Sequence, residues 1–196
     1  PDETQRLLLF LRRVDRIAIF DRQRLVAEVS RKTSPSKSPG GPGHLHMTLR
    51  SATGAKRTQS WLRFTGKTER EPMRTPDGRP EKDQTVQVAV PDTDITDQEI
   101  AGVFAGRLYN YLPTEIRTGL PFQINGDFYP STDRKSIDND RYHHQLWHSA
   151  VLEAIGDCFV QAIPYLLERF REHPEQFYRR LPITASTALA EPIVEA

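Results

Sequence analysis

Along several stretches of the chain, hydrophobic and polar residues alternate, which is typical of strands with one buried face. The alternation is clearest at residues 44–51, where Leu45, Met47 and Leu49 fall on one face of the predicted strand. Turn-forming residues separate these stretches, and a polar turn at residues 21–24 predicts a hairpin. The predicted strands are residues 16–21, 25–31, 44–51, 59–66, 85–90, 107–112 and 122–128. We therefore expect a mostly antiparallel sheet of about five to seven strands.

A helical spacing of apolar residues covers a long segment in the last third of the chain. Apolar side chains from Leu146 to Phe170 recur at intervals of three, four and one, which predicts a helix with one broad apolar face. Asn139 or Asp140 is placed to cap this helix, and Pro164 is expected to kink or split it. Such a face needs a sheet or another helix to cover it.

Two shorter helices are expected elsewhere. Residues 3–13 are rich in leucine and arginine, and Thr96 has a glutamate three residues later, as in a capping box before a helix. The fold class that follows is α+β, with a mostly antiparallel sheet packed on a long, kinked C-terminal helix. We expect residues 1–14 to be a linking helix, residues 15–173 the α+β domain, and residues 174–196 a short turn and a loose tail.

The composition narrows the class of protein. The 196 residues include 37% hydrophobic and 27% charged residues, and the net charge of +1 argues against a strong general nucleic-acid binder. The single cysteine, Cys158, excludes an internal disulfide and lies on the apolar stripe of the long helix. No apolar run approaches the ~20 residues of a membrane span, so we expect a cytoplasmic protein without a membrane partner. Helix-like residues almost directly after Pro1 suggest a segment of a longer protein.

The most distinctive stretch is residues 112–137, where turn dipeptides and a charged cluster surround two short apolar runs. It contains Leu112-Pro113, Glu115, Thr118-Gly119-Leu120-Pro121, Ile124-Asn125-Gly126-Asp127-Phe128 and Ser131-Thr132-Asp133-Arg134-Lys135. In order and spacing, this stretch resembles the sacsin-like branch of the Bergerat-fold (GHKL) ATPases. That superfamily contains the ninety-kilodalton heat-shock chaperone, DNA gyrase B and the mismatch-repair ATPases.

The resemblance implies a position within such a protein. The nucleotide-binding domain of the family carries a metal-binding asparagine and glycine-rich boxes, and no Gly-x-Gly-x-x-Gly or Gly-x-x-x-x-Gly-Lys-Ser/Thr loop occurs in this sequence. The chain therefore resembles the segment downstream, the middle or transducer domain, whose fold is similar to the second domain of a small-subunit ribosomal protein. The implied function is chaperone-like: sensing the nucleotide state of an upstream ATP-binding domain and transmitting its closure, with a protein client as a possible further partner. ATP and magnesium would belong to the parent protein, and this segment would hold no cofactor and not turn over ATP alone.

The resemblance also implies which residues act. Arg134 or Lys135 would reach the terminal phosphate, a role that suits a guanidinium fork or a mobile ammonium. The neighbouring candidates for ligand contact are Asn125, Gly126, Ser131 and Thr132. Each of these residues could instead have a purely structural role. Arg134 could pair with Asp133, Asp138 or Asp140, Asn125-Gly126 could be a plain turn, and Glu115 could pair with Arg117.

Two other functions are compatible with the sequence. The chain could be a nucleotide-independent module that binds a protein or a nucleic acid through its sheet face or through the charged residues 67–82. Alternatively, it could be a metal hydrolase, because His144 and His148 have a spacing that metal ligands use on helices, with His143 beside them. However, position 145 is Gln rather than a general-base Glu, and no acidic third ligand follows at a fixed spacing, so we expect no metal site.

Overall fold

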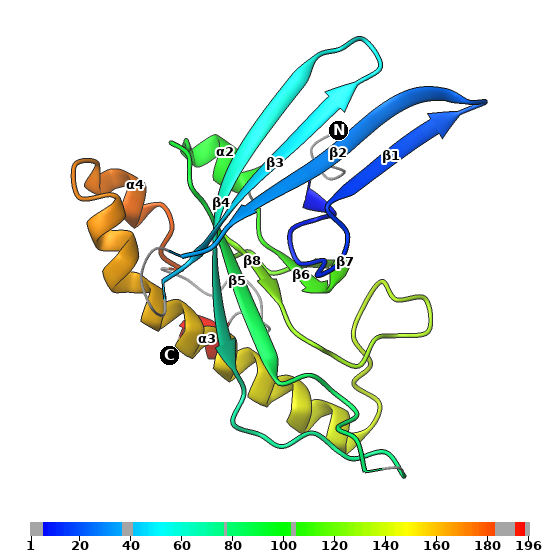
Figure 1. Ribbon diagram of the computed structural model, residues 1–196. Coiled ribbons are helices and arrows are strands. Elements are labelled where there is room, and N and C mark those ends of the chain that lie inside the picture. Colours follow the sequence, from blue (N-terminus) through cyan, green and yellow to red (C-terminus); the bar gives the residue numbers. More distant parts are fainter. Residues whose placement is uncertain (1–5, 37–40, 77, 103–104, 183–190, 195–196) are drawn as a thin grey trace.

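The structure, a computed structural model, describes residues 6–36, 41–76, 78–102, 105–182 and 191–194. An eight-stranded sheet in the order β1-β2-β3-β4-β5-β8-β6-β7 lies against a long helix, α3 (Figure 1). All neighbouring strands are antiparallel except β6 and β8, which are parallel. The strands are β1 (Arg16–Asp21), β2 (Arg24–Ser34), β3 (Gly43–Ser51), β4 (Lys56–Lys67), β5 (Thr85–Pro91), β6 (Arg107–Asn110), β7 (Leu112–Arg117) and β8 (Gln123–Asn125). The α+β class and the mostly antiparallel sheet are confirmed, with one strand more than the expected maximum.

The strands predicted from residue 107 onward differ most from the structure. Strand β6 ends at Asn110, and Tyr111, with a φ of 62°, reverses the chain into β7. The predicted single strand at residues 107–112 is therefore wrong, because the left-handed backbone of Tyr111 makes a hairpin there. The strand predicted at residues 122–128 is reduced to the three residues of β8. After β8 the chain turns toward α3.

The helix α3 (Tyr142–Arg169) runs without interruption through Pro164, so the proline does not split it. Its cap residue is Arg141, which makes no side-chain cap. The predicted cap by Asn139 or Asp140 is wrong, because the Asn139 side chain contacts His148 instead. By length and composition, α3 could cross a membrane, contrary to the expectation from the sequence. Half of its apolar stretch is buried inside this fold.

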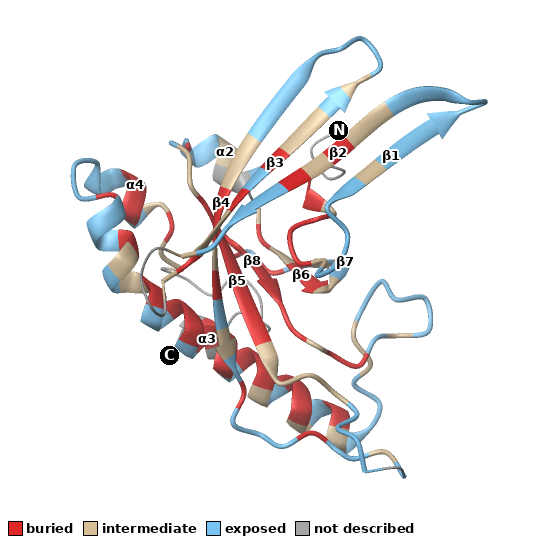
Figure 2. Cartoon of the chain, viewed as in Figure 1, coloured by how far each residue is buried: buried red, intermediate tan, exposed pale blue. Residues whose placement is uncertain are grey.

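Two hydrophobic clusters lie on opposite faces of the sheet. Leu62, Val88 and Leu108 belong to the cluster beneath α3, whereas their neighbours Trp61 and Tyr109 belong to the second cluster. Consecutive residues of a strand point to opposite faces, so the middle of the sheet is buried on both sides. Figure 2 shows this burial concentrated where the sheet crosses α3, and exposed residues at the far ends of β1 to β4.

The second cluster explains why the predicted N-terminal helix is wrong over its described part. Helical structure reaches no further than Arg6, and the side chains of Leu8, Leu9 and Phe10 are all fully buried. One helix face cannot bury three consecutive residues, so this segment packs as irregular chain against the sheet. Residues 1–5 lie outside the described residues.

Three short helices complete the part of the fold that the structure describes. The helix α2 (Asp97–Ala101) begins with the predicted capping box between Thr96 and Glu99, and α4 (Pro174–Tyr178) is the predicted short turn. The tail was expected to be loose, but α5 (Glu191–Val194) buries Ile193 in the core beneath α3. The expectation is therefore wrong at residues 191–194, and residues 183–190 lie outside the described residues.

Candidate functional site

The charged cluster of the distinctive stretch forms a small loop, residues 131–136, between the sheet and α3. The loop is closed by hydrogen bonds from Ser131 N to Ser136 O (3.0 Å) and from Arg134 N to Ser131 O (2.9 Å). Asp133 accepts from Ser131 Oγ at 2.7 Å and from Lys135 N at 3.0 Å. These bonds lower the pKa of the Asp133 carboxyl, the bond from Lys135 N most. The loop is therefore a defined turn rather than a loose excursion.

Arg134 lies at the turn of this loop in a strained conformation. Its φ is 59°, in the left-handed region that costs a non-glycine residue about 1 kcal/mol or more. The residue is exposed, and its guanidinium makes no hydrogen bond or ion pair with any residue that the structure describes. The alternative pairs with Asp133, Asp138 and Asp140 are therefore not formed.

Lys135 is engaged with the edge strand β7. Its ammonium lies 2.7 Å from Glu115 Oε1, and its carbonyl accepts from Glu115 N at 2.7 Å. The hydrogen bond to Glu115 raises the pKa of Lys135. Because Glu115 pairs with Lys135, the alternative pair with Arg117 is wrong. Both partners are exposed, so water screens their attraction and an anion can compete for the ammonium.

Ser131 and Thr132 have different surroundings within the loop. The Ser131 hydroxyl accepts from Ser136 N at 3.1 Å while it donates to Asp133, so it closes the loop rather than facing a ligand. Thr132 is exposed beside Arg134. The loop thus presents Thr132 and Arg134 outward on a backbone fixed by Ser131 and Asp133.

Asn125 and Gly126 lie in the core, away from the loop surface. The Asn125 side chain accepts from Tyr111 N at 2.8 Å and donates to Gln87 Oε1 at 3.3 Å. A Cβ on Gly126 would lie 2.5 Å from Val151 Cγ1 of α3. The interpretation as a plain turn is wrong, because Asn125 ends β8 and Gly126 lets the chain pass close to the helix.

The Thr-Gly-Leu-Pro sequence also has a structural account. Gly106 donates to Leu120 O at 2.8 Å and accepts from Thr118 N at 3.0 Å, and a Cβ on Gly106 would lie 2.4 Å from Leu120 O. Gly119 supplies the turn with a φ of 73°. Most of the distinctive stretch therefore builds the fold, and Arg134 is the part of it that the fold does not explain.

The histidines lie directly behind this loop. His144 and His148 are buried on α3 and contact the residues that flank the loop. Among the residues that the structure describes, no group of three potential ligands could hold a metal ion. The contact between these histidines and the residues that flank the loop joins positions distant in sequence, so it could not be predicted from spacing along the chain.

Lys82 is a second residue that sequence reasoning missed. Its ammonium lies 3.2 Å from Asp127 Oδ1, 3.0 Å from Phe128 O and 4.4 Å from the centre of the Tyr129 ring. Burial, and then the nearby Glu81, raise the pKa of Tyr129 to about 12. Lys82 thus ties the 67–82 excursion to the chain just before the loop, and nothing in the sequence pattern singled it out.

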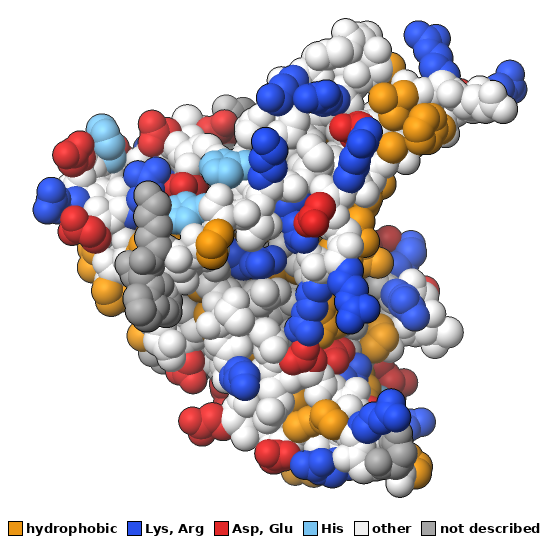
Figure 3. All heavy atoms as spheres, in the orientation of Figure 1, with side chains coloured by type: hydrophobic (Ala, Val, Ile, Leu, Met, Phe, Trp, Pro, Cys, Tyr) orange, Lys and Arg blue, Asp and Glu red, His pale blue; other side chains and the backbone are white. Residues whose placement is uncertain are grey.

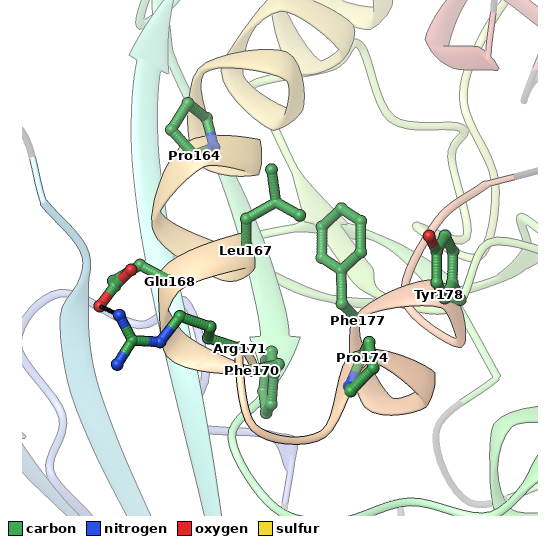
Figure 4. A pocket seen from close by; sticks show the side chains of 8 residues that line it. All are labelled: Pro164, Leu167, Glu168, Phe170, Arg171, Pro174, Phe177 and Tyr178. Atoms are coloured by element: carbon green, nitrogen blue, oxygen red, sulfur yellow. Dashed lines mark ion pairs between the residues drawn. The ribbon is translucent and has the colours of Figure 1, made fainter.

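A separate groove of about 480 Å³ lies between the end of α3 and α4 (Figure 4). Its walls are Pro164, Leu167, Phe170, Pro174, Phe177 and Tyr178, with the ion pair of Glu168 and Arg171 at the rim. The groove is lined mainly by apolar side chains and can accept apolar side chains of a partner.

The comparisons with known proteins add no assignment. The chain matches no family model, and neither the curated proteins nor the solved structures gave a match. Any proposal about function therefore rests on the geometry of the 131–136 loop and on the sequence resemblance of residues 112–137.

Proposed function

We propose that this chain is the middle (transducer) domain of a sacsin-like ATPase, in which Arg134 senses the nucleotide held by a preceding ATP-binding domain. The observation that carries the proposal is Arg134 itself: an exposed guanidinium without a described partner, on a left-handed backbone that the loop hydrogen bonds maintain. Strain of this kind persists where the surroundings enforce it, and it concentrates at functional sites.

The surroundings of the loop support this role. Edge strand β7 holds the loop through Glu115, and the N-terminal segment packs on the neighbouring strand β6, where the rings of Phe10 and Tyr109 lie 4.9 Å apart. Arg12 lies 5.3 Å from the centre of the Tyr111 ring at the hairpin between these strands. A domain that precedes residue 6 would therefore join the sheet near the edge that carries the loop.

The chemistry that the loop can supply is charge stabilisation. In phosphoryl transfer, charge spreads over the oxygens of the transferred group, and a positioned guanidinium stabilises it. Arg134 would contact the terminal phosphate on closure, and Lys135 would exchange Glu115 for a phosphate oxygen. ATP and Mg²⁺ would be held by the preceding domain, and this chain would signal closure to a downstream segment or protein client. The similarity to the second domain of a small-subunit ribosomal protein and the cytoplasmic location belong to the same proposal.

The test replaces Arg134 and Lys135 by alanine in the full-length protein that contains this chain. We expect the ATPase rate to fall at least about tenfold, because removing one donor from a developing charge typically costs more than that. The matched control is Arg141→Ala, another exposed arginine outside the loop, which should leave the rate unchanged. An unchanged rate and unchanged domain closure in the double variant would show that the loop senses no nucleotide.

A second candidate function is the binding of an anionic partner at the far ends of the sheet. Four of the exposed large hydrophobic residues fall within residues 19–26, and Phe20 is 61% exposed. Residues 19–26 and 50–57, which we call the hairpin tips, carry five Lys and Arg against one Asp, although the chain as a whole has a net charge of only +1. Figure 3 shows basic and hydrophobic side chains together at the end of the β1–β2 hairpin. This is the observation that favours a protein- or nucleic-acid-binding module.

Salt-dependent binding distinguishes the second candidate. Replacement of Arg22, Arg24 and Arg50 by Gln should weaken binding of a labelled single-stranded oligonucleotide and reduce the slope of log K against log salt by about 2. A control removes three exposed arginines elsewhere, Arg70, Arg117 and Arg141. Equal effects of the two triple variants, or no binding by the unaltered chain, would exclude a nucleic-acid site at the hairpin tips.

A further inference from the structure

Both ends of the 131–136 loop meet at one side chain, His148 of α3. Ahead of the loop, Tyr129 N donates to His148 Nε2 at 3.0 Å. Behind the loop, Asn139 Oδ1 lies 2.8 Å from His148 Nδ1. His148 is 3% exposed, and its bond to Tyr129 N is buried, whereas its bond to the exposed Asn139 is partly buried. A single buried ring therefore closes the loop at its base.

The chemistry of the partners fixes the state of the ring. A backbone N–H can only donate, so Nε2 must carry no proton, and the neutral ring then has its proton on Nδ1. That proton is donated to the Asn139 oxygen, which in turn orients the amide. Burial, and then the neighbouring His144 and Lys82, lower the pKa of His148 to about 4, against the opposing charge of Asp138. At neutral pH the ring therefore keeps both bonds.

The same end of α3 makes further contacts with the two segments that flank the loop. The His144 ring stacks on the Tyr129 ring with their centres 3.8 Å apart, and His144 Nδ1 lies 3.2 Å from Asp138 Oδ2. Trp147 Nε1 donates to Asp127 O at 2.8 Å, ahead of the loop. The loop cannot shift on its base unless the first turns of α3 move with it or these bonds break.

We propose that His148 is the positioning residue of this loop: it holds Arg134 in register with α3 and couples a displacement of the loop to the helix. The phosphate-dependent part of this inference rests on the proposed function, whereas the mechanical part concerns the chain alone. In the proposed transducer, contact between Arg134 and a phosphate would displace the loop, and His148 would transmit this displacement to α3. That helix packs on β4 and β5 and carries the motion toward the C-terminal part of the chain.

The mechanical part is tested by amide hydrogen exchange on this chain with His148→Leu and His148→Gln. The leucine removes both bonds, whereas the glutamine amide can still accept from Tyr129 and donate to Asn139. In His148→Leu, we expect the amide exchange rates of Arg134, Lys135 and Ser136 to rise about tenfold. This is the size of effect that the loss of one stabilising hydrogen bond has on local opening. His148→Gln should stay close to the unaltered chain, and strands β3 to β5 should be unaffected in both. Should His148→Leu fail to fold, Asn139→Ala removes only one of the two bonds and serves instead. Unchanged loop exchange in a folded variant would overturn the inference.

The coupling part is tested in the full-length protein with the same variants beside Arg134→Ala. We expect His148→Leu to lower the ATPase rate about as much as Arg134→Ala, without a change in the KM for ATP, and His148→Gln to restore it. An effect of Arg134→Ala with none of His148→Leu would overturn the positioning role and leave the proposed function intact. No effect of Arg134→Ala would overturn the proposed function, while the exchange experiment would still decide the mechanical part.

Discussion

Gly126 and Val151 are in such close contact that a Cβ on the glycine would lie 2.5 Å from Val151 Cγ1. This approach lets the chain leave β8 directly beneath α3 and begin the path to the 131–136 loop. Gly126→Ala should therefore destabilise the fold by about 1–3 kcal/mol, the typical cost of overpacking a core. The midpoint of urea unfolding measures this change.

A double variant checks that the cause is steric. Val151→Ala removes the clashing methyl group, so Gly126→Ala should cost less in a Val151→Ala background than alone. Gly54→Ala serves as a comparison, because Gly54 has a φ of 82° but nothing within 4 Å of an added Cβ. Additive costs of Gly126→Ala and Val151→Ala would indicate that the glycine is needed for another reason.

The stability of the chain should fall in mild acid because of His148. Burial lowers the pKa of His148 from 6.5 to about 4, with His144 and Lys82 acting in the same direction and Asp138 opposing them. Above pH 6.5 the ring is neutral in both states. Between pH 6.5 and 4 only the unfolded chain takes up the proton, so the folded state loses stability as the pH falls, by about 2 kcal/mol. Below pH 4 this contribution levels off.

The comparison with His148→Gln isolates this effect from the titration of carboxylates. Glutamine does not titrate, so the unaltered chain should lose about 2 kcal/mol of unfolding free energy relative to His148→Gln between pH 7 and pH 4. A difference that stays constant across this range would mean that His148 protonates as readily in the folded chain as in the unfolded one.

Arg180 is expected to be a large contributor to stability. Its buried guanidinium donates to Pro91 O at 3.0 Å, to Thr93 O at 2.6 Å and to Gln176 O, and it lies 4.0 Å from the centre of the Phe170 ring. Burial lowers its pKa to about 10. Arg180→Met leaves these carbonyls without their donor and should cost about 2–4 kcal/mol in unfolding free energy. Arg180→Lys keeps one charged donor and should cost less.

The contrast with Arg179 provides the control for this prediction. Arg179 is the neighbouring residue, and its side chain pairs with the exposed Asp97 at 2.7 Å. Arg179→Met should therefore change stability by less than about 1 kcal/mol. Similar losses for the two variants would indicate that the whole of α4, rather than the buried guanidinium, is being disturbed.

The part of the fold that follows from local pattern could be predicted from the sequence. Residues 44–51 alternate because one face of β3 is buried, and the apolar stripe of α3 follows from its packing on the sheet. The N-terminal segment differs from the predicted helix because, although leucine and arginine are good helix formers, tertiary packing buries Leu8, Leu9 and Phe10 together. The hairpin at Tyr111 was missed because a left-handed non-glycine residue leaves no clear signal in a sequence.

The candidate site was predictable only in outline. The position of Arg134 and Lys135 between a strand and a helix was expected, and both lie there. The pairing of Lys135 with Glu115 and the contact of His148 with both ends of the loop join residues from separate elements. Such contacts depend on how the elements pack, so spacing along the chain could not reveal them.

The strain at Arg134 leads to a prediction in which stability and function move in opposite directions. A glycine adopts a φ of 59° without the steric cost that arginine carries there, although it loses more entropy on folding. Arg134→Gly should therefore leave the chain equally stable or more stable by about 0.5 kcal/mol, as judged by urea unfolding. The same variant should lower the ATPase rate of the full-length protein as much as Arg134→Ala. A loss of stability in Arg134→Gly would mean that the arginine side chain supports the loop, and the strain would then need no functional explanation. Preserved stability with a reduced ATPase rate would mean that the strained backbone is retained because it places the Arg134 guanidinium for contact with the nucleotide.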